Sequence, residues 1–265
     1  MLSYPSGMSM STRTVRVLAG LLRGHRRRIG TRWRLLTPAR QALLVLAHLR
    51  KGETYTDLAS GFRVGKSTVS RYVAEAIGLL AALAPTLEQA ITVAAGKAFV
   101  ILDGTLLRID RVGMGSGYDR AFYSGKHKCH GLNVQVIADP AGRLVWISPP
   151  LPGARHDMGA ARIHGIIDAV NTTGVRAVAD TAYQGGGPAI TVPHRRRRRD
   201  LDTGRYRPLS ANQKAVNAAH ARRRAPGERV NAELKNWKIL RKIRSSPSQA
   251  AQLVAAIQTL MITTA

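Results

Sequence analysis

Two short, largely apolar runs that each end in an aspartate constrain the fold of this chain most strongly. The first covers residues 98–102 and is followed by Asp103 and a glycine, and the second covers residues 174–179 and is followed by Asp180. A short apolar run closed by a turn residue is typical of a strand buried on both faces. We therefore expect Asp103 and Asp180 at the carboxyl ends of two strands, where open α/β sheets place their ligands.

Two strands that each bring a carboxylate to the same end of a sheet predict a paired-carboxylate metal site. For either strand taken alone, the aspartate could simply open a turn, and that alternative stays open. The composition favours a site, because the chain has 41 Lys and Arg residues against 15 Asp and Glu residues and a net charge of +26. In a chain so poor in acids, we expect each remaining carboxylate to be placed for a specific role.

The charge balance also predicts the partner. A strongly basic protein binds a polyanion, and nucleic acid is the commonest one. Anionic membrane is the competitor, but no apolar run approaches the roughly 18 residues that a spanning helix needs. The single cysteine, Cys129, excludes an internal disulfide and fits a reducing cytoplasm.

The amino-terminal third predicts a small helical DNA-binding domain. Residues 1–36 form a basic arm, and a helix begins at Thr37 with a proline in its first turn. Thr56 is expected to cap a short helix, residues 61–65 to turn, and Ser67 to cap a second helix with one apolar face. Such a helix-turn-helix places the start of its second helix in the major groove, although an ordinary helical hairpin is the alternative. The side chains expected at bases and phosphates are Lys66, Ser67, Thr68, Ser70 and Arg71.

A linker brings the domain to about residue 95, and residues 96–265 form the main domain. Strict alternation over residues 132–138 predicts a half-buried strand, and residues 144–148 return as its hairpin partner. A helix is expected over residues 158–170 with Asp157 as its N-cap, and His156 is a candidate for the site. Further helices are expected over residues 210–224, from Gly227 to about Leu240 after a break at Pro226, and over residues 247–260.

Two basic segments of the main domain are expected along phosphate backbones. His127, Cys129 and His130 have the residue types of a zinc site, but no second ligand pair stands at a suitable spacing. Phosphate contacts fit this segment better. The residues expected at phosphates are Lys126, His127, Lys128, Arg195, Arg196 and Arg197.

Five motifs, taken in order, resemble the insertion-sequence transposases of the DDE endonuclease superfamily, closest to the IS-five/Harbinger-like group. The resemblance covers roughly residues 36–260. The motifs are Asp103-Gly-Thr, Tyr123-Ser-Gly-Lys-His-Lys with Gly131-Leu-Asn-Val-Gln-Val, Gly153-Ala-Arg-His-Asp157, Ala179-Asp180-Thr-Ala-Tyr-Gln-Gly, and Glu228 followed by Leu234-Lys235 and Trp237.

The resemblance implies an α/β fold with an RNase H-like mixed sheet flanked by helices, preceded by a small all-α helix-turn-helix domain. It implies that Asp103, Asp180 and Glu228 are the catalytic, metal-binding residues, with Mg²⁺ as the cofactor and Mn²⁺ as a substitute. Glu233 is the rival for the third position. Because the family's acid precedes its Leu-Lys pair by six residues, the resemblance selects Glu228. His156 and Asp157 remain accessory candidates.

The function implied is a DNA transposase that binds element ends in double-stranded DNA and catalyses metal-dependent strand cleavage and strand transfer. One alternative is a catalytically silent DNA-binding descendant of such an enzyme. Another is a nuclease of the same fold that cuts RNA in hybrids, which a helix-turn-helix suited to duplex DNA disfavours. The family also implies a homo-oligomer assembled on DNA.

Overall fold

The chain folds into two compact units that do not follow one another along the sequence. The computed structural model describes residues 8, 10–31, 34–110, 118–196, 199, 202–205, 208–244 and 246–264. The first unit comprises Met1–Pro85, Leu107–Val112 and Glu233–Ala265, and the second comprises Thr86–Leu106 and Gly113–Ala232. The domain boundaries expected from the sequence stay a prediction.

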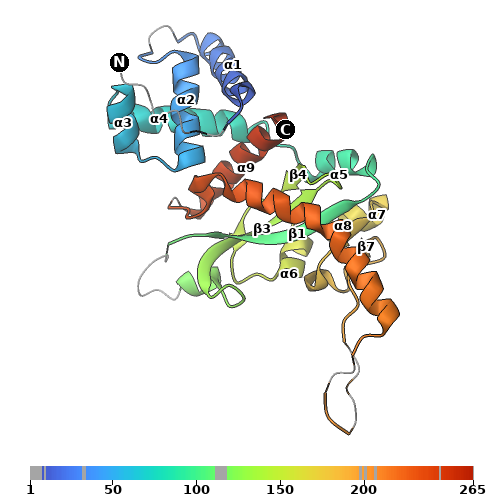
Figure 1. The fold of residues 1–265 in the computed structure, drawn as a ribbon. Coiled ribbons are helices and arrows are strands. Elements are labelled where there is room, and N and C mark those ends of the chain that lie inside the picture. Colours follow the sequence, from blue (N-terminus) through green and yellow to red (C-terminus); the bar gives the residue numbers. More distant parts are fainter. Residues whose placement is uncertain are drawn as a thin grey trace. The chain divides into compact units, whose positions relative to one another are not determined.

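The first unit is helical (Figure 1). Helix α9 from the end of the chain packs against α4 and α1, and the Thr259 hydroxyl donates a 2.9 Å hydrogen bond to the carbonyl oxygen of Leu80. The buried leucines Leu18 and Leu22 fix α1 to this core. The elements are α1 (Thr12–Arg28), α2 (Pro38–Lys51), α3 (Tyr55–Phe62), α4 (Lys66–Ala81), the 3₁₀ turn η3 (Lys238–Leu240) and α9 (Pro247–Thr264).

The predicted helix-turn-helix is present, with shifted caps. Thr37 caps α2 as predicted. Thr54, not Thr56, caps α3, because its hydroxyl accepts from the backbone N–H of Asp57. The N-cap of α4 is Gly65 rather than Ser67, and the turn is made by Arg63 in the left-handed region. Helix α1 lies within the stretch that the sequence had suggested as a basic arm.

The second unit is built on a mixed sheet of the order β2-β3-β1-β6-β7, with β4 and β5 also paired to β3. Strand β6 is parallel to β1 and to β7, whereas β2, β4 and β5 are antiparallel to β3. The strands are β1 (Val100–Arg108), β2 (Tyr123–Ser124), β3 (Cys129–Ala138), β4 (Leu144–Ile147), β5 (Leu151–Pro152), β6 (Ala177–Ala179) and β7 (Ile190–Thr191).

Helices cover both faces of this sheet (Figure 1). Val100 and Leu102 belong to the apolar core that β1 shares with α5, α6 and α7. Ile101 points the other way, towards Gly227 of α8. The helices are α5 (Leu87–Ala95), α6 (Asp157–Ile163), α7 (Ile166–Thr173) and α8 (Ala211–Lys235), and the 3₁₀ turns are η1 (Tyr118–Phe122) and η2 (Thr181–Tyr183). The RNase H-like mixed sheet flanked by helices was predicted correctly.

Three predicted elements differ in extent. The single helix over residues 158–170 is two helices, because Gly165 adopts a left-handed conformation between α6 and α7. Helix α8 runs continuously through Pro226 instead of restarting there. Strand β3 is buried on both faces rather than half-buried, since its polar residues Asn133 and Gln135 are also buried.

None of the described helices has both the length and the apolar character that crossing a bilayer requires.

The contact between α8 and β1 gives the first prediction. A Cβ on Gly227 would lie 2.6 Å from Cγ2 of the buried Ile101, closer than packed carbon atoms come. Gly227→Ala should therefore lower the free energy of unfolding by about 1–3 kcal/mol, measured by urea denaturation. The matched control is Gly159→Ala on α6, where a Cβ meets nothing within 4 Å, and which should stabilise by up to about 1 kcal/mol. Equal stability of the two variants would contradict this packing.

Candidate active site

Asp103 and Asp180 lie side by side on neighbouring parallel strands. Leu102 of β1 pairs with Ala179 of β6, so the same register continued by one residue places Asp103 beside Asp180. Asp180 closes β6 as predicted, and its Oδ1 accepts a 2.8 Å hydrogen bond from the N–H of Ala182. Asp103, in contrast, lies within β1, because that strand continues to Arg108. The prediction that Asp103 ends its strand was wrong, whereas the prediction that Asp103 and Asp180 lie on neighbouring strands was correct.

Helix α8 holds the carboxylate of Asp103. The side-chain amide of Asn231 donates a 2.8 Å hydrogen bond to Oδ2, and Nη2 of Arg224 lies 3.7 Å from Oδ1. Residues 220, 224, 227 and 231 follow the helical repeat and share one face of α8. On that face His220 makes a 2.8 Å hydrogen bond through Nε2 with the carbonyl oxygen of Ala179. The helix is thus attached both to β6 and to the Asp103 side chain.

The surroundings of Asp103 alter its acidity. Burial raises the pKa of Asp103 from 3.8 to about 6. Arg224 opposes this rise, whereas the negative charges of Asp180 and Asp157 add to it. Three carboxylates and one guanidinium therefore act on one another here, and a cation bound at this position would relieve the mutual repulsion of the acids.

The two candidates for the third acid differ in position. Glu228 is exposed on α8, one turn after Arg224 and three residues before Asn231. Glu233 follows Asn231 by two residues, which turns it to the opposite side of the helix. It belongs to the first unit, where it lines a hollow with Arg50 and Trp237. Over the described part of the chain, no three His, Cys, Asp or Glu side chains lie close enough together to hold a metal ion. The carboxylate of Glu228 therefore does not form a three-acid cluster with Asp103 and Asp180.

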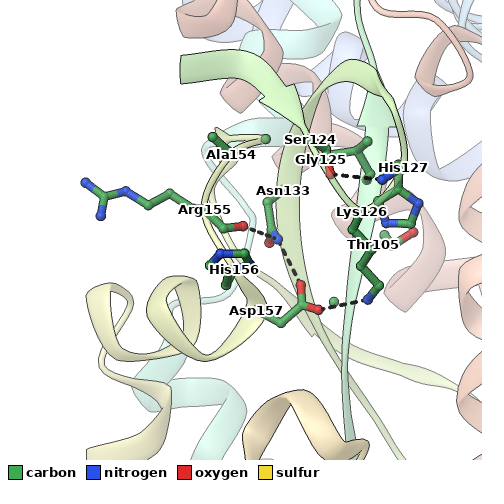
Figure 2. Close-up of a pocket in the computed structure, with 13 residues that line it drawn as sticks. Thr105, Ser124, Gly125, Lys126, His127, Asn133, Ala154, Arg155, His156 and Asp157 are labelled. Carbon is green, nitrogen blue, oxygen red and sulfur yellow. Dashed lines mark hydrogen bonds and ion pairs between the residues drawn. The ribbon is translucent and has the colours of Figure 1, made fainter. Parts of the chain in front are cut away.

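Asp157 lies against the opposite face of β1 (Figure 2). A Cβ on Gly104 would collide with Oδ1 of Asp157, so the absence of a side chain makes room for this carboxylate. Because successive side chains of a strand alternate between its faces, Asp103 points away from Asp157. The N-cap of α6 is His156, which is exposed, and Asp157 is the first residue of the helix. The predicted N-cap role of Asp157 was therefore wrong.

Asp157 is held by side chains from two other elements. Its Oδ1 accepts a 2.9 Å hydrogen bond from the amide of Asn133, and Nζ of Lys126 lies 3.4 Å from Oδ2 (Figure 2). The hollow at this point measures about 40 Å³, which has room for a few water molecules but not for a nucleotide. Figure 2 shows the side chain of Arg155 pointing away from it.

A buried chain of hydrogen bonds connects Asp157 to the loop after Asp180. The amide of Gln135 donates to Oδ1 of Asn133 at 2.8 Å, and the hydroxyl of Tyr183 donates to Oε1 of Gln135 at 2.6 Å. Burial raises the pKa of Tyr183 well above its usual value, so the phenol remains a donor. Asn133, Gln135 and Tyr183 were not predicted from the sequence as residues of the site. The polar residues at alternate positions of β3 were the available signal for this buried chain of hydrogen bonds, but they were interpreted as the solvent-facing side of a half-buried strand.

The predicted DNA-contacting residues occupy surface positions in both units. The five on the first turns of α4 are exposed, apart from the half-buried Thr68. Lys126, His127 and Lys128 are exposed in the turn between β2 and β3, and Arg195 and Arg196 are exposed after β7. Arg197 lies outside the described residues.

Paired aspartates on adjacent parallel strands of an RNase H-like sheet, in a chain that also carries a helix-turn-helix, are typical of the nuclease-like folds. Residues 102–261 match the DDE superfamily endonucleases, and residues 33–86 match the helix-turn-helix of DDE superfamily endonucleases. The chain therefore belongs to the DDE endonuclease superfamily.

A curated relative supports this assignment. It is a Streptomyces albus G protein that carries the provisional name of transposase for insertion sequence element IS112. The two sequences are 33% identical over 218 residues, which is 82% of this chain and 76% of the relative. No solved structure gives a significant match.

The buried hydrogen-bond chain gives a second prediction. Tyr183→Phe removes the only hydrogen from the Tyr183–Gln135 bond and leaves a buried acceptor unsatisfied, so the free energy of unfolding should fall by about 1–3 kcal/mol. Tyr123→Phe, at an exposed tyrosine of β2, is the control and should change stability by less than about 0.5 kcal/mol. Urea denaturation of both variants measures the difference. Equal effects would show that the hydroxyl of Tyr183 does not need its partner.

The pKa of Asp103 gives a third prediction, for the metal-free protein. Its folded-state pKa of about 6 lies above the ordinary 3.8, so the stability that Asp103 contributes is fully present below 3.8 and is lost as the pH rises through 6. Relative to Asp103→Asn, the wild type should lose about 1 kcal/mol of unfolding free energy between about pH 5 and pH 8. Urea denaturation in chelator at both pH values measures this. Parallel pH profiles would mean that Asp103 is not buried as described.

Proposed function

We propose that this protein is a DNA transposase that binds the ends of a DNA element and catalyses metal-dependent strand cleavage and strand transfer. The observation that carries the proposal is the parallel register that sets Asp103 beside Asp180 under α8. Membership of the DDE endonuclease superfamily supplies the reaction class, which is phosphoryl transfer at a phosphodiester. Glu228 is the third acid of the proposal.

The residues at this position fit a divalent cation. Carboxylate oxygens are the ligands that Mg²⁺ prefers, and Mn²⁺ accepts the same set. Arg224 already places a positive charge at Asp103, and Oδ1 of Asn231 is buried beside it without a hydrogen-bond partner among the described residues. Asp103, Asp180 and Glu228 would hold the metal. Bound Mg²⁺ would activate a water or a DNA 3′-hydroxyl and stabilise the leaving oxygen.

Glu228 is preferred to Glu233 because of its place on α8. Glu228 follows Arg224 by four residues and therefore stands on the side of the helix that contacts Asp103. A change of side-chain rotamer moves a glutamate carboxylate by several ångströms without moving the helix. Glu233, on the opposite side of α8, would need the helix itself to rotate.

The helix-turn-helix would supply the recognition of the element ends. Lys66, Ser67, Ser70 and Arg71 are exposed on the first turns of α4, which is the part of a recognition helix that meets base edges. The amino-terminal residues of α4 would thus read sequence, while the exposed basic turns of the second unit would contact phosphates.

The test is a cleavage and strand-transfer assay on DNA that carries the sequences flanking the gene, with Mg²⁺ or Mn²⁺. Asp103→Ala, Asp180→Ala and Glu228→Ala should each lower the rate at least about 100-fold, because a metal ligand contributes several kcal/mol to the transition state. DNA binding should persist in all three. The control is Asp168→Ala, which removes an exposed carboxylate on α7 and should leave the rate unchanged.

Two results would change the proposal. Loss of activity in Glu233→Ala but not in Glu228→Ala would reject the third acid while keeping the two aspartates. Specific binding to the element ends without cleavage in either metal would replace the enzyme by a silent DNA-binding descendant.

A further inference from the structure

Helix α1 carries a row of arginines on its outer face. Arg16, Arg23 and Arg27 are separated by seven and four residues, so they stand above one another along the helix, and all three are exposed. The buried residues Leu18 and Leu22 lie on the opposite side. The row is outside both family matches, which begin at residues 33 and 102.

These arginines differ from Arg26 and Arg34, which have structural partners. Arg26 donates a 2.6 Å hydrogen bond to Oε1 of Gln41, and Arg34 forms a 3.0 Å ion pair with Glu75. Arg16, Arg23 and Arg27 form no ion pair or side-chain hydrogen bond within the described residues. No acid precedes Glu53 in the sequence, and Glu75, which does reach α1, lies at its inner face against His25 and Arg34.

We infer that this row, called here the α1 arginine row and consisting of Arg16, Arg23 and Arg27, is a second DNA-binding surface that contacts the phosphate backbone. The inference rests on the proposed function, because it takes duplex DNA as the partner. Arg16 and Arg27 are eleven residues apart, which spans about 17 Å along a helix. That length suffices to reach phosphates on both sides of a major groove about 12 Å wide.

The packing of α1 favours DNA over a membrane surface. A helix that lies in a membrane interface needs an exposed apolar face beside its basic one. The apolar face of α1 is covered, because α1 packs against α2 and α9 within the first unit. Between the arginines the outer face carries Gly20 and Gly24, where a Cβ would meet nothing within 4 Å. The charged row is therefore not interrupted by apolar side chains.

The α1 arginine row is distinct from the recognition residues of α4. Helix α1 does contact α4, but through its inner face, where His25 lies 3.5 Å from Glu75, beyond the first turns of α4. Helix α2 packs against both α1 and α3, and it lies between them (Figure 1). The row would therefore extend the footprint of the first unit along the duplex and add affinity without sequence preference, since phosphate contacts carry no base information.

The test is the salt dependence of binding to a duplex that carries the element end and to an unrelated duplex of the same length, measured by fluorescence anisotropy. Arg16→Gln/Arg23→Gln should weaken binding to both duplexes alike, by on the order of 10-fold at 0.15 M salt. It should also lower the slope of log K against log salt by about 2, roughly 0.9 per lost phosphate contact. Arg16→Lys/Arg23→Lys keeps the charge and should keep the slope.

The control is Arg162→Gln/Arg176→Gln, which removes two exposed arginines of the second unit. The inference is overturned if this control and the α1 variant have the same slope, or if the lysine variant weakens as much as the glutamine variant. In either case specific binding by the wild type would leave the proposed function standing. If the wild type binds neither duplex but binds vesicles of phosphatidylcholine and phosphatidylserine, both proposals fail.

Discussion

The parallel pairing of β1 with β6 is the constraint on which the candidate active site depends. Its register sets Asp103 beside Asp180, although the two residues are separated by 77 positions in the sequence. Burial disfavours the charged carboxylate and the adjacent Asp180 repels it, which is why the pKa of Asp103 rises to about 6. Helix α8 offsets part of this cost through Arg224 and Asn231. Helix α8, which carries the proposed third acid, therefore also stabilises the two aspartates without a metal.

Much of this arrangement could be predicted, because local patterns determine it. Apolar runs that end in an aspartate indicated both central strands, and the caps and periodicity of the first helices indicated the helix-turn-helix. The length of β1 could not be predicted in this way. A glycine after an apolar run predicts the end of a strand at Gly104. In the structure, Gly104 instead makes room for Asp157, a residue that comes 53 positions later. Such a close approach leaves no signal in the neighbouring sequence.

The errors at Asp157 and β3, and the missing helix α1, have a common physical cause. In each case, a polar or basic residue was interpreted from its neighbours in the sequence, and its actual environment is set by a distant element. Asn133 and Gln135 alternate with apolar residues as if they faced water, but Asp157 and Tyr183 satisfy their hydrogen bonds inside the protein. The stretch that contains α1 was interpreted only as a basic arm, because the α2 and α9 residues that cover its apolar face lie elsewhere in the chain.

The scarcity of acids has a consequence beyond the active site. Asp139 is almost fully buried, and burial alone would raise its pKa, but hydrogen bonds from the backbone and guanidinium of Arg143 lower that pKa below its usual value. Glu75 likewise lies within ion-pair distance of Arg34 and His25 inside the first unit. Acids of this kind act as internal counter-ions, so they do little to neutralise the outer surface. The surface therefore keeps most of the net charge of +26. A long-range attraction to polyanions follows from where the few acids are placed as much as from how many basic residues there are.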